Sequence, residues 1–63
     1  MKRTYLQDEA NTHYNLGIAY YTKGQYEQAI NEWVQSLTKN PQNSEARFKL
    51  GVAYYQLNRI DEA

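Results

Sequence analysis

The sequence predicts an all-α fold of antiparallel helix-turn-helix repeats, with three helices and the start of a fourth. Two observations support this prediction. The chain repeats itself with a period of 34 residues, and a fixed period of this length is typical of stacked helical repeats. Within each repeat, apolar residues recur at spacings of three and four, which places them on one face of an α-helix.

The repeat is visible when residues 10–29 are aligned with residues 44–63, because the two segments share six identities in twenty. Chance would give about one identity at typical residue frequencies. The identical pairs are Leu16/Leu50, Gly17/Gly51, Ala19/Ala53, Tyr20/Tyr54, Tyr21/Tyr55 and Ala29/Ala63. Pairs that keep their chemical type are Tyr14/Phe48, Ile18/Val52, Tyr26/Ile60 and Glu27/Asp61.

The first helix is predicted over residues 8–23, which contain no proline, and we expect residues 1–9 to extend it. Gly24 then ends the helix, because glycine adopts the left-handed conformation that closes a helix C-terminus. Asn58 stands at the matching place in the second repeat and tolerates that conformation next best. We therefore expect a turn at both places.

The second helix is predicted over residues 26–39, with Trp33 on its apolar face. Pro41 ends it, because proline disfavours helical geometry at the preceding residue.

A third helix is predicted over residues 44–57, and either Asn43 or Ser44 can cap it. A fourth begins near Arg59 and has about one turn before the sequence stops.

Composition excludes several classes of function. The 63 residues carry seven basic and seven acidic side chains, which leaves no electrostatic footprint for nucleic acid or an anionic membrane. No stretch approaches the roughly 18 apolar residues that a membrane helix needs. There is no cysteine, so disulfides and thiolate ligands are excluded. We expect a cytoplasmic protein whose core alone leaves it marginally stable, because so short a chain buries only about 60% of its surface.

The motif formed by these residues resembles the tetratricopeptide repeat (TPR), whose 34-residue signature is W-x2-L-G-x2-Y, then A-x3-F, then P. In the first repeat the residues at these places are His13, Leu16, Gly17, Tyr20, Ala29, Trp33 and Pro41, and in the second they are Arg47, Leu50, Gly51, Tyr54 and Ala63. His13 and Arg47 depart from the signature, because they replace its first large aromatic residue. The resemblance implies a TPR-like α-solenoid fragment of about one and a half repeats.

The resemblance also divides the chain. Residues 1–9 are expected to form an N-terminal helical extension, residues 10–43 the first repeat, and residues 44–63 a second repeat truncated in its second helix. We expect the 63 residues to come from a longer repeat protein. Gly17 and Gly51 are expected where another helix approaches closely, because small and apolar residues that recur periodically mark a core.

In TPR proteins the first helices of successive repeats line a concave surface that binds extended peptides or helices of partner proteins. The resemblance therefore implies a non-enzymatic protein-protein interaction module with its site on this face. The partner-binding residues it nominates are Asn11, Tyr14, Asn15, Ile18, Tyr21, Thr22, Glu45, Phe48, Lys49, Val52, Tyr55 and Gln56. For Tyr21 and Tyr55, the alternative that they pack between adjacent repeats stays open.

Self-association is the alternative function. About three repeats are usually needed to bury a continuous core, so the third helix leaves Leu50, Gly51 and Tyr54 in need of cover. Helices of another copy can supply it, either by stacking or by exchange across residues 39–43. We therefore also expect a homo-oligomer.

Catalysis has little support in the sequence. His13 is the only histidine, and with no cysteine or second histidine a metal site or a nucleophile–base pair is not expected. Packing at the edge of the core is the role expected for His13. The carboxylates of the second helices of the two repeats are expected on a solvated face; they are Glu27, Glu32, Asp61 and Glu62. No cofactor, metal or enzymatic activity is predicted.

Overall fold

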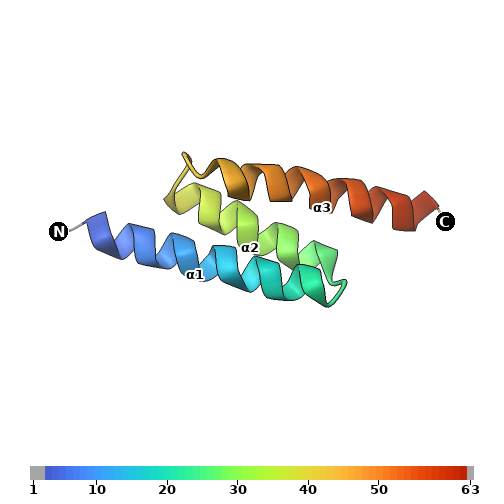
Figure 1. Ribbon diagram of the computed structural model, residues 1–63, viewed down its shortest axis with the longest axis horizontal. Helices are drawn as coiled ribbons and strands as arrows, with labels where there is room; N and C mark the ends of the chain where they lie inside the picture. Colours follow the sequence, from blue (N-terminus) through green and yellow to red (C-terminus); the bar gives the residue numbers. More distant parts are fainter. Residues whose placement is uncertain (1–2, 63) are drawn as a thin grey trace.

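The computed structural model shows three antiparallel helices joined by two short turns (Figure 1). Helix α1 spans Arg3–Thr22, α2 spans Tyr26–Lys39 and α3 spans Ser44–Glu62. The structure describes the backbone of residues 3–62 and the side chains of residues 8–59. No strand occurs within residues 3–62, so the predicted all-α fold is confirmed.

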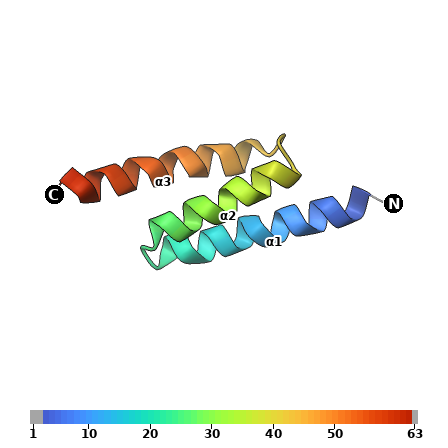
Figure 2. The same cartoon turned by 180° about the vertical axis from the view of Figure 1, so that it is seen from behind.

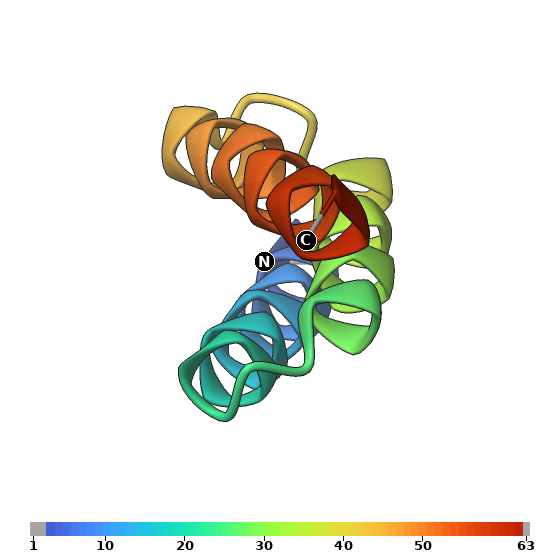
Figure 3. The ribbon, with the colours of Figure 1, turned by 90° about the vertical axis from the view of Figure 1, so that its right-hand side faces the viewer.

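Helix α2 lies in the middle and packs against both neighbours (Figures 1 and 2). Seen end-on, α1 and α3 diverge on one side of α2 (Figure 3). The Cα extents are 47 × 19 × 13 Å and the radius of gyration is 12.1 Å, against about 10.6 Å for a compact chain of this length. The protein is therefore a single curved layer of helices with two long edges.

The first turn forms as the glycine predicts. Gly24 adopts a φ of 80°, its N–H donates to the carbonyl of Tyr21 at 2.9 Å, and the Gln25 N–H donates to the carbonyl of Tyr20 at 2.9 Å. This pair of bonds is the Schellman motif, which satisfies carbonyls at the end of a helix.

The second turn spans Asn40 to Asn43 and places α3 antiparallel to α2. Asn43 caps α3, because its Oδ1 accepts a hydrogen bond from the Ala46 N–H at 3.1 Å and its carbonyl accepts from the Arg47 N–H at 3.2 Å. Of the two capping residues that the sequence allowed, the structure selects Asn43.

The turn predicted at Asn58 and the fourth helix predicted from Arg59 are wrong. Helix α3 continues without a break to Glu62, and no non-glycine residue of the described backbone has a positive φ. A turn at Asn58 would sacrifice hydrogen bonds of α3, and a new helix after it would carry the cost of nucleation. Continuing α3 satisfies the same backbone groups at no nucleation cost. Ala63 lies outside the described residues.

The core consists of small side chains around one indole. Trp33 is 1% exposed and lies against Gly17, where an added Cβ would overlap the indole ring. The other buried residues are Ala10, Ala29, Ser36, Ala46 and Ala53. Alanine and glycine let the three helix backbones approach closely, and Trp33 fills the space between them. None of the helices, over the residues that the structure describes, is long and apolar enough to cross a membrane.

Candidate binding groove

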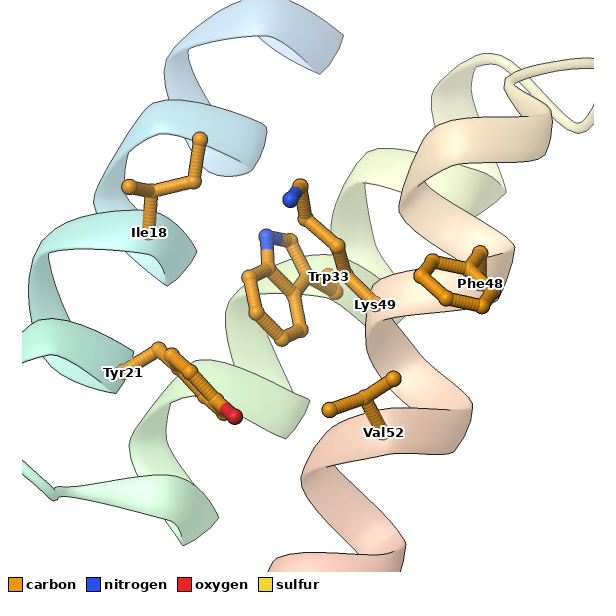
Figure 4. Close-up of a pocket in the computed structure, with 6 residues that line it drawn as sticks. All are labelled: Ile18, Tyr21, Trp33, Phe48, Lys49 and Val52. Atoms are coloured by element: carbon orange, nitrogen blue, oxygen red, sulfur yellow. The ribbon is translucent and has the colours of Figure 1, made fainter.

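A groove runs between α1 and α3, with α2 as its floor (Figure 4). It encloses a cavity of about 190 Å³. Two of the residues that line it come from α1, one from α2 and three from α3; they are Ile18, Tyr21, Trp33, Phe48, Lys49 and Val52. Five of the six belong to the predicted partner-binding set. The structure therefore places predicted residues of α1 and α3 on the two sides of one groove.

Trp33 is the floor residue that the sequence did not nominate for the site. Its apolar position on the second helix predicted a core residue, and its side chain is indeed buried. The indole Nε1–H donates to the carbonyl of Tyr14 at 3.0 Å, which fixes the ring in orientation. The size of its side chain could have identified it, because a tryptophan that lies against Gly17 is long enough to cross the core and reach the groove.

Tyr21 lies between two other aromatic rings. Its centroid is 5.8 Å from that of Trp33 and 5.1 Å from that of Tyr26, and both pairs are tilted. These separations lie within the favourable range for aromatic pairs. Tyr21 therefore packs within the helix pair α1–α2 of the first repeat and also lines the groove. Its role in partner binding stays a prediction.

The rim of the groove is apolar and accessible. Phe48 is 72% exposed, an unusual value for a phenylalanine, and Ile18 is also exposed. Lys49 extends from α3 toward the Trp33 ring (Figure 4), and its ammonium group forms no ion pair with the described residues. The groove thus combines apolar walls with one available cation.

A hydrogen bond joins the two walls. The Tyr14 hydroxyl on α1 donates to Glu45 Oε1 on α3 at 3.1 Å. Partial burial, then the hydrogen bond to Glu45 and the negative charge of Glu45, raise the pKa of Tyr14 above its ordinary value of 10.0. Both residues belong to the predicted partner-binding set, and this bond is the direct polar link between α1 and α3 among the described side chains.

The remaining predicted residues lie outside the cavity. Thr22 donates its hydroxyl to the carbonyl of Ile18 at 2.9 Å, so it is engaged with its own helix. Tyr55 is exposed, and the Arg59 guanidinium lies 5.7 Å from its ring centroid. The other residues that do not line the cavity are Asn11, Asn15 and Gln56.

The three predicted self-association residues divide into two kinds. Leu50 is partly buried and packs against the cluster of Ala29, Trp33 and Ala53, because α2 already covers its side of α3. Gly51 has no described atom within 4 Å of an added Cβ, and Tyr54 is 52% exposed. Only Gly51 and Tyr54 therefore lie on an uncovered face.

His13 and Glu32 form a polar contact between α1 and α2. Nδ1 of His13 lies 2.7 Å from Oε1 of Glu32, and both side chains are partly buried. His13 lies at the edge of the core, as predicted. Glu32 is partly buried, so the expectation that its carboxylate lies on a solvated face is wrong. No cluster of three potential metal ligands occurs among the described residues.

Comparison with known proteins gives one family. The family model of the TPR repeat matches residues 19–58, which is 40 of the 63 residues. No curated protein and no solved structure shows a significant match to the chain. The matched segment contains all of α2 and five of the six residues that line the groove; Ile18 precedes it by one residue.

Proposed function

The chain belongs to the TPR repeat family, and from that premise we propose that it binds a peptide or helix of a partner protein in the groove between α1 and α3. A TPR repeat implies a protein-protein interaction module in general, and such repeats are typically non-catalytic. The proposal adds the location of the site and the form of the ligand.

The observation that carries the proposal is an apolar groove with a rigid floor. Trp33 is held by its bond to the Tyr14 carbonyl and by the neighbouring ring of Tyr21, so the floor is ordered before any ligand arrives. Phe48 and Ile18 are exposed on opposite walls. Aromatic anchors that need no reordering are the kind of residue that dominates binding energy in interfaces.

The size of the cavity limits what enters it. A cavity of about 150 Å³ lined by apolar residues holds one benzene molecule, so the cavity of about 190 Å³ accommodates one aromatic or branched aliphatic side chain. We therefore expect a partner segment that inserts a single apolar residue. Its neighbouring carbonyl or carboxylate group would face Lys49.

Peptides selected from a random phage-displayed library on the wild-type chain would test this. Trp33 is the only tryptophan and lies at the floor, so its fluorescence reports binding directly for peptides without tryptophan. We expect Phe48→Ala to weaken binding about tenfold or more, and Tyr14→Ala to weaken it less. Val34→Ala, at an exposed residue of α2, is the control. Affinity unchanged in both groove variants would refute the site.

Self-association is the second candidate, and the exposed Gly51 and Tyr54 favour it. Stacking of copies through this face would give a mass that rises with concentration in sedimentation equilibrium. Leu50 contributes less than expected to such an interface, because it already packs on α2. A mass equal to one chain up to the highest soluble concentration would exclude this candidate.

A further inference from the structure

The two walls of the groove are helices that run in the same direction on one side of α2 (Figures 1 and 3). The Tyr14 hydroxyl of α1 donates to Glu45 Oε1 of α3, 31 residues further along the chain. Two further pairs with this offset line the cavity; they are Ile18/Lys49 and Tyr21/Val52. The bond between Tyr14 and Glu45 therefore crosses the groove about one helical turn before the cavity.

Little else holds α1 to α3. Each of the two helices packs along α2, and they scarcely pack on each other. Among the described side chains, the bond between Tyr14 and Glu45 is the hydrogen bond that joins them, and no ion pair does so. Packed helices can shear against one another, so the separation of the two walls depends on what restrains α3 relative to α1. This bond is such a restraint.

Tyr14 also connects the bond to the floor of the groove. Its carbonyl accepts a hydrogen bond from Trp33 Nε1–H at 3.0 Å, and its hydroxyl donates to Glu45 at 3.1 Å. On α3, the backbone beside Glu45 is held in place, because Ala46 is 0% exposed and its N–H donates to Asn43 Oδ1. Both ends of the bond therefore rest on ordered parts of the fold.

The chemistry of the bond suits a restraint that can be opened. Its acceptor is a carboxylate, and hydrogen bonds to charged groups are stronger than those between neutral groups. Its length of 3.1 Å nevertheless exceeds the value of about 2.7–2.8 Å that is usual between two oxygens. Partial burial, the bond itself and the charge of Glu45 all raise the pKa of Tyr14, so the hydroxyl keeps the proton that it donates.

The cavity beside this bond has room for one side chain of limited size. Its volume of about 190 Å³ is not much larger than the cavity of about 150 Å³ that holds one benzene molecule. A leucine or phenylalanine side chain fits this space, whereas an indole would press the walls apart at Ile18 and Val52. Admitting the larger ring would stretch the bond between Tyr14 and Glu45.

We propose that Tyr14 and Glu45 form a latch that sets the width of the groove and thereby selects the side chain that the groove accepts. This inference rests on the proposed function, because it concerns the specificity of the same groove. With the latch closed, the groove takes a leucine or phenylalanine side chain and discriminates against tryptophan. Tyr14 and Glu45 act here as positioning residues, since their effect passes through the separation of the two walls.

Quenching of Trp33 fluorescence by acrylamide measures the width of the groove without a ligand. Trp33 is the only tryptophan and is 1% exposed, so a wider groove admits more quencher to its ring. Tyr14→Phe removes the hydroxyl but keeps the ring, and it should raise the quenching constant about twofold. Glu45→Ala should have the same effect. Glu45→Gln is the matched control and should behave like the wild type, because its amide oxygen still accepts the bond.

A series of peptides then tests the selection of the side chain. The anchor of a peptide selected on the wild-type chain is the residue whose replacement by alanine weakens binding most, and it is changed to leucine, phenylalanine or tryptophan. Anisotropy of a fluorescein label measures the affinities. We expect the wild type to bind the leucine and phenylalanine peptides about tenfold more tightly than the tryptophan peptide.

In Tyr14→Phe this ratio should fall to about twofold, because the unlatched walls close less readily on the smaller side chains and separate more readily for the larger one. Tyr14→Phe combined with Glu45→Ala should change the ratio no more than either substitution alone, since both remove the same bond. A general loss of stability would weaken all three peptides equally and leave the ratio unchanged. Circular dichroism of each variant confirms that the three helices remain.

The results distinguish the latch from the groove itself. Unchanged quenching in Tyr14→Phe and Glu45→Ala, or an unchanged ratio of affinities, would overturn the latch and leave the groove as a binding site. If no peptide binds the wild type, the proposed function fails and the selection of side chains fails with it. Quenching that still rises in Tyr14→Phe but not in Glu45→Gln would then support the latch as the restraint on the width of the groove.

Discussion

Gly17 and Trp33 determine how closely α1 and α2 approach. The indole lies over Gly17, and its Nε1–H donates to the carbonyl of Tyr14 on the same helix. The ring can rest on the backbone of α1 only because residue 17 has no Cβ. The identity of two single residues therefore determines the spacing of the helix pair.

Replacing each repeated glycine by alanine should change stability in opposite directions. Gly17→Ala forces the rigid Trp33 ring to move, and such overpacking costs about 1–3 kcal/mol. Gly51→Ala meets no described atom and should raise the free energy of unfolding by up to about 1 kcal/mol through helix propensity. Urea denaturation followed by circular dichroism measures both. Equal effects of the two substitutions would contradict the packing described for Gly17.

Tyr14 makes stability depend on alkaline pH. Its pKa is raised in the folded chain above 10.0, so the unfolded chain loses the proton first as the pH rises. The stabilisation is therefore complete below pH 10.0 and is lost as the pH rises through the folded-state pKa.

Melting temperatures measured on either side of this value in wild type and Tyr14→Phe test the effect. We expect the wild type to lose more stability than the variant on going to the higher pH. The other six tyrosines are common to both proteins, so the difference isolates Tyr14. An identical pH dependence in the two proteins would show that the raised pKa of Tyr14 does not contribute to stability.

Among the elements, both ends of α2 were predicted correctly from the sequence, whereas the end of α3 was not. The bounds of α2, Tyr26–Lys39, agree with the prediction because Gly24 and Pro41 act locally, through their own backbone conformations. The end of α3 was predicted wrongly because Asn58 permits a left-handed turn without requiring one. Whether such a residue turns depends on the packing around it, which local patterns do not record.

The N-cap of α3 provides a test of the second turn. Asn43→Ala removes the side-chain acceptor for the Ala46 N–H and should lower the free energy of unfolding by about 1 kcal/mol. Asn43→Asp keeps an acceptor and should retain most of the stability. The comparison is made by thermal denaturation; a loss as large for aspartate as for alanine would argue against the cap.

Across the molecule as a whole, α2 holds the other two helices together. Helices α1 and α3 each pack on it and meet one another mainly across the groove. Its central residue, Trp33, contacts Gly17 on α1 and belongs to the same cluster as Ala53 on α3. One side chain therefore couples both repeats.

Trp33→Ala should consequently unfold the entire chain rather than one helix. Replacing a buried tryptophan by alanine costs about 3–5 kcal/mol, which is comparable with the total stability expected of so small a core. We expect the variant to lose the helical circular dichroism signal of all three helices together. Val34→Ala, next to it but exposed, should change the free energy of unfolding by about 0.5 kcal/mol or less. Retention of α1 and α3 without Trp33 would disprove the coupling.

Periodicity and local backbone preferences were enough to predict the repeat and both ends of α2, and the resemblance to the TPR family added the residues that wall the groove, including Ile18 and Phe48. Each of these properties is encoded within a short stretch of the amino-acid sequence. The packing of the three helices was needed to show that Trp33 forms the floor, that Leu50 is already covered, and that Gly51 is open. Those properties depend on which helix lies against which face, and two identical residues in equivalent repeats differ when only one of them has a neighbour.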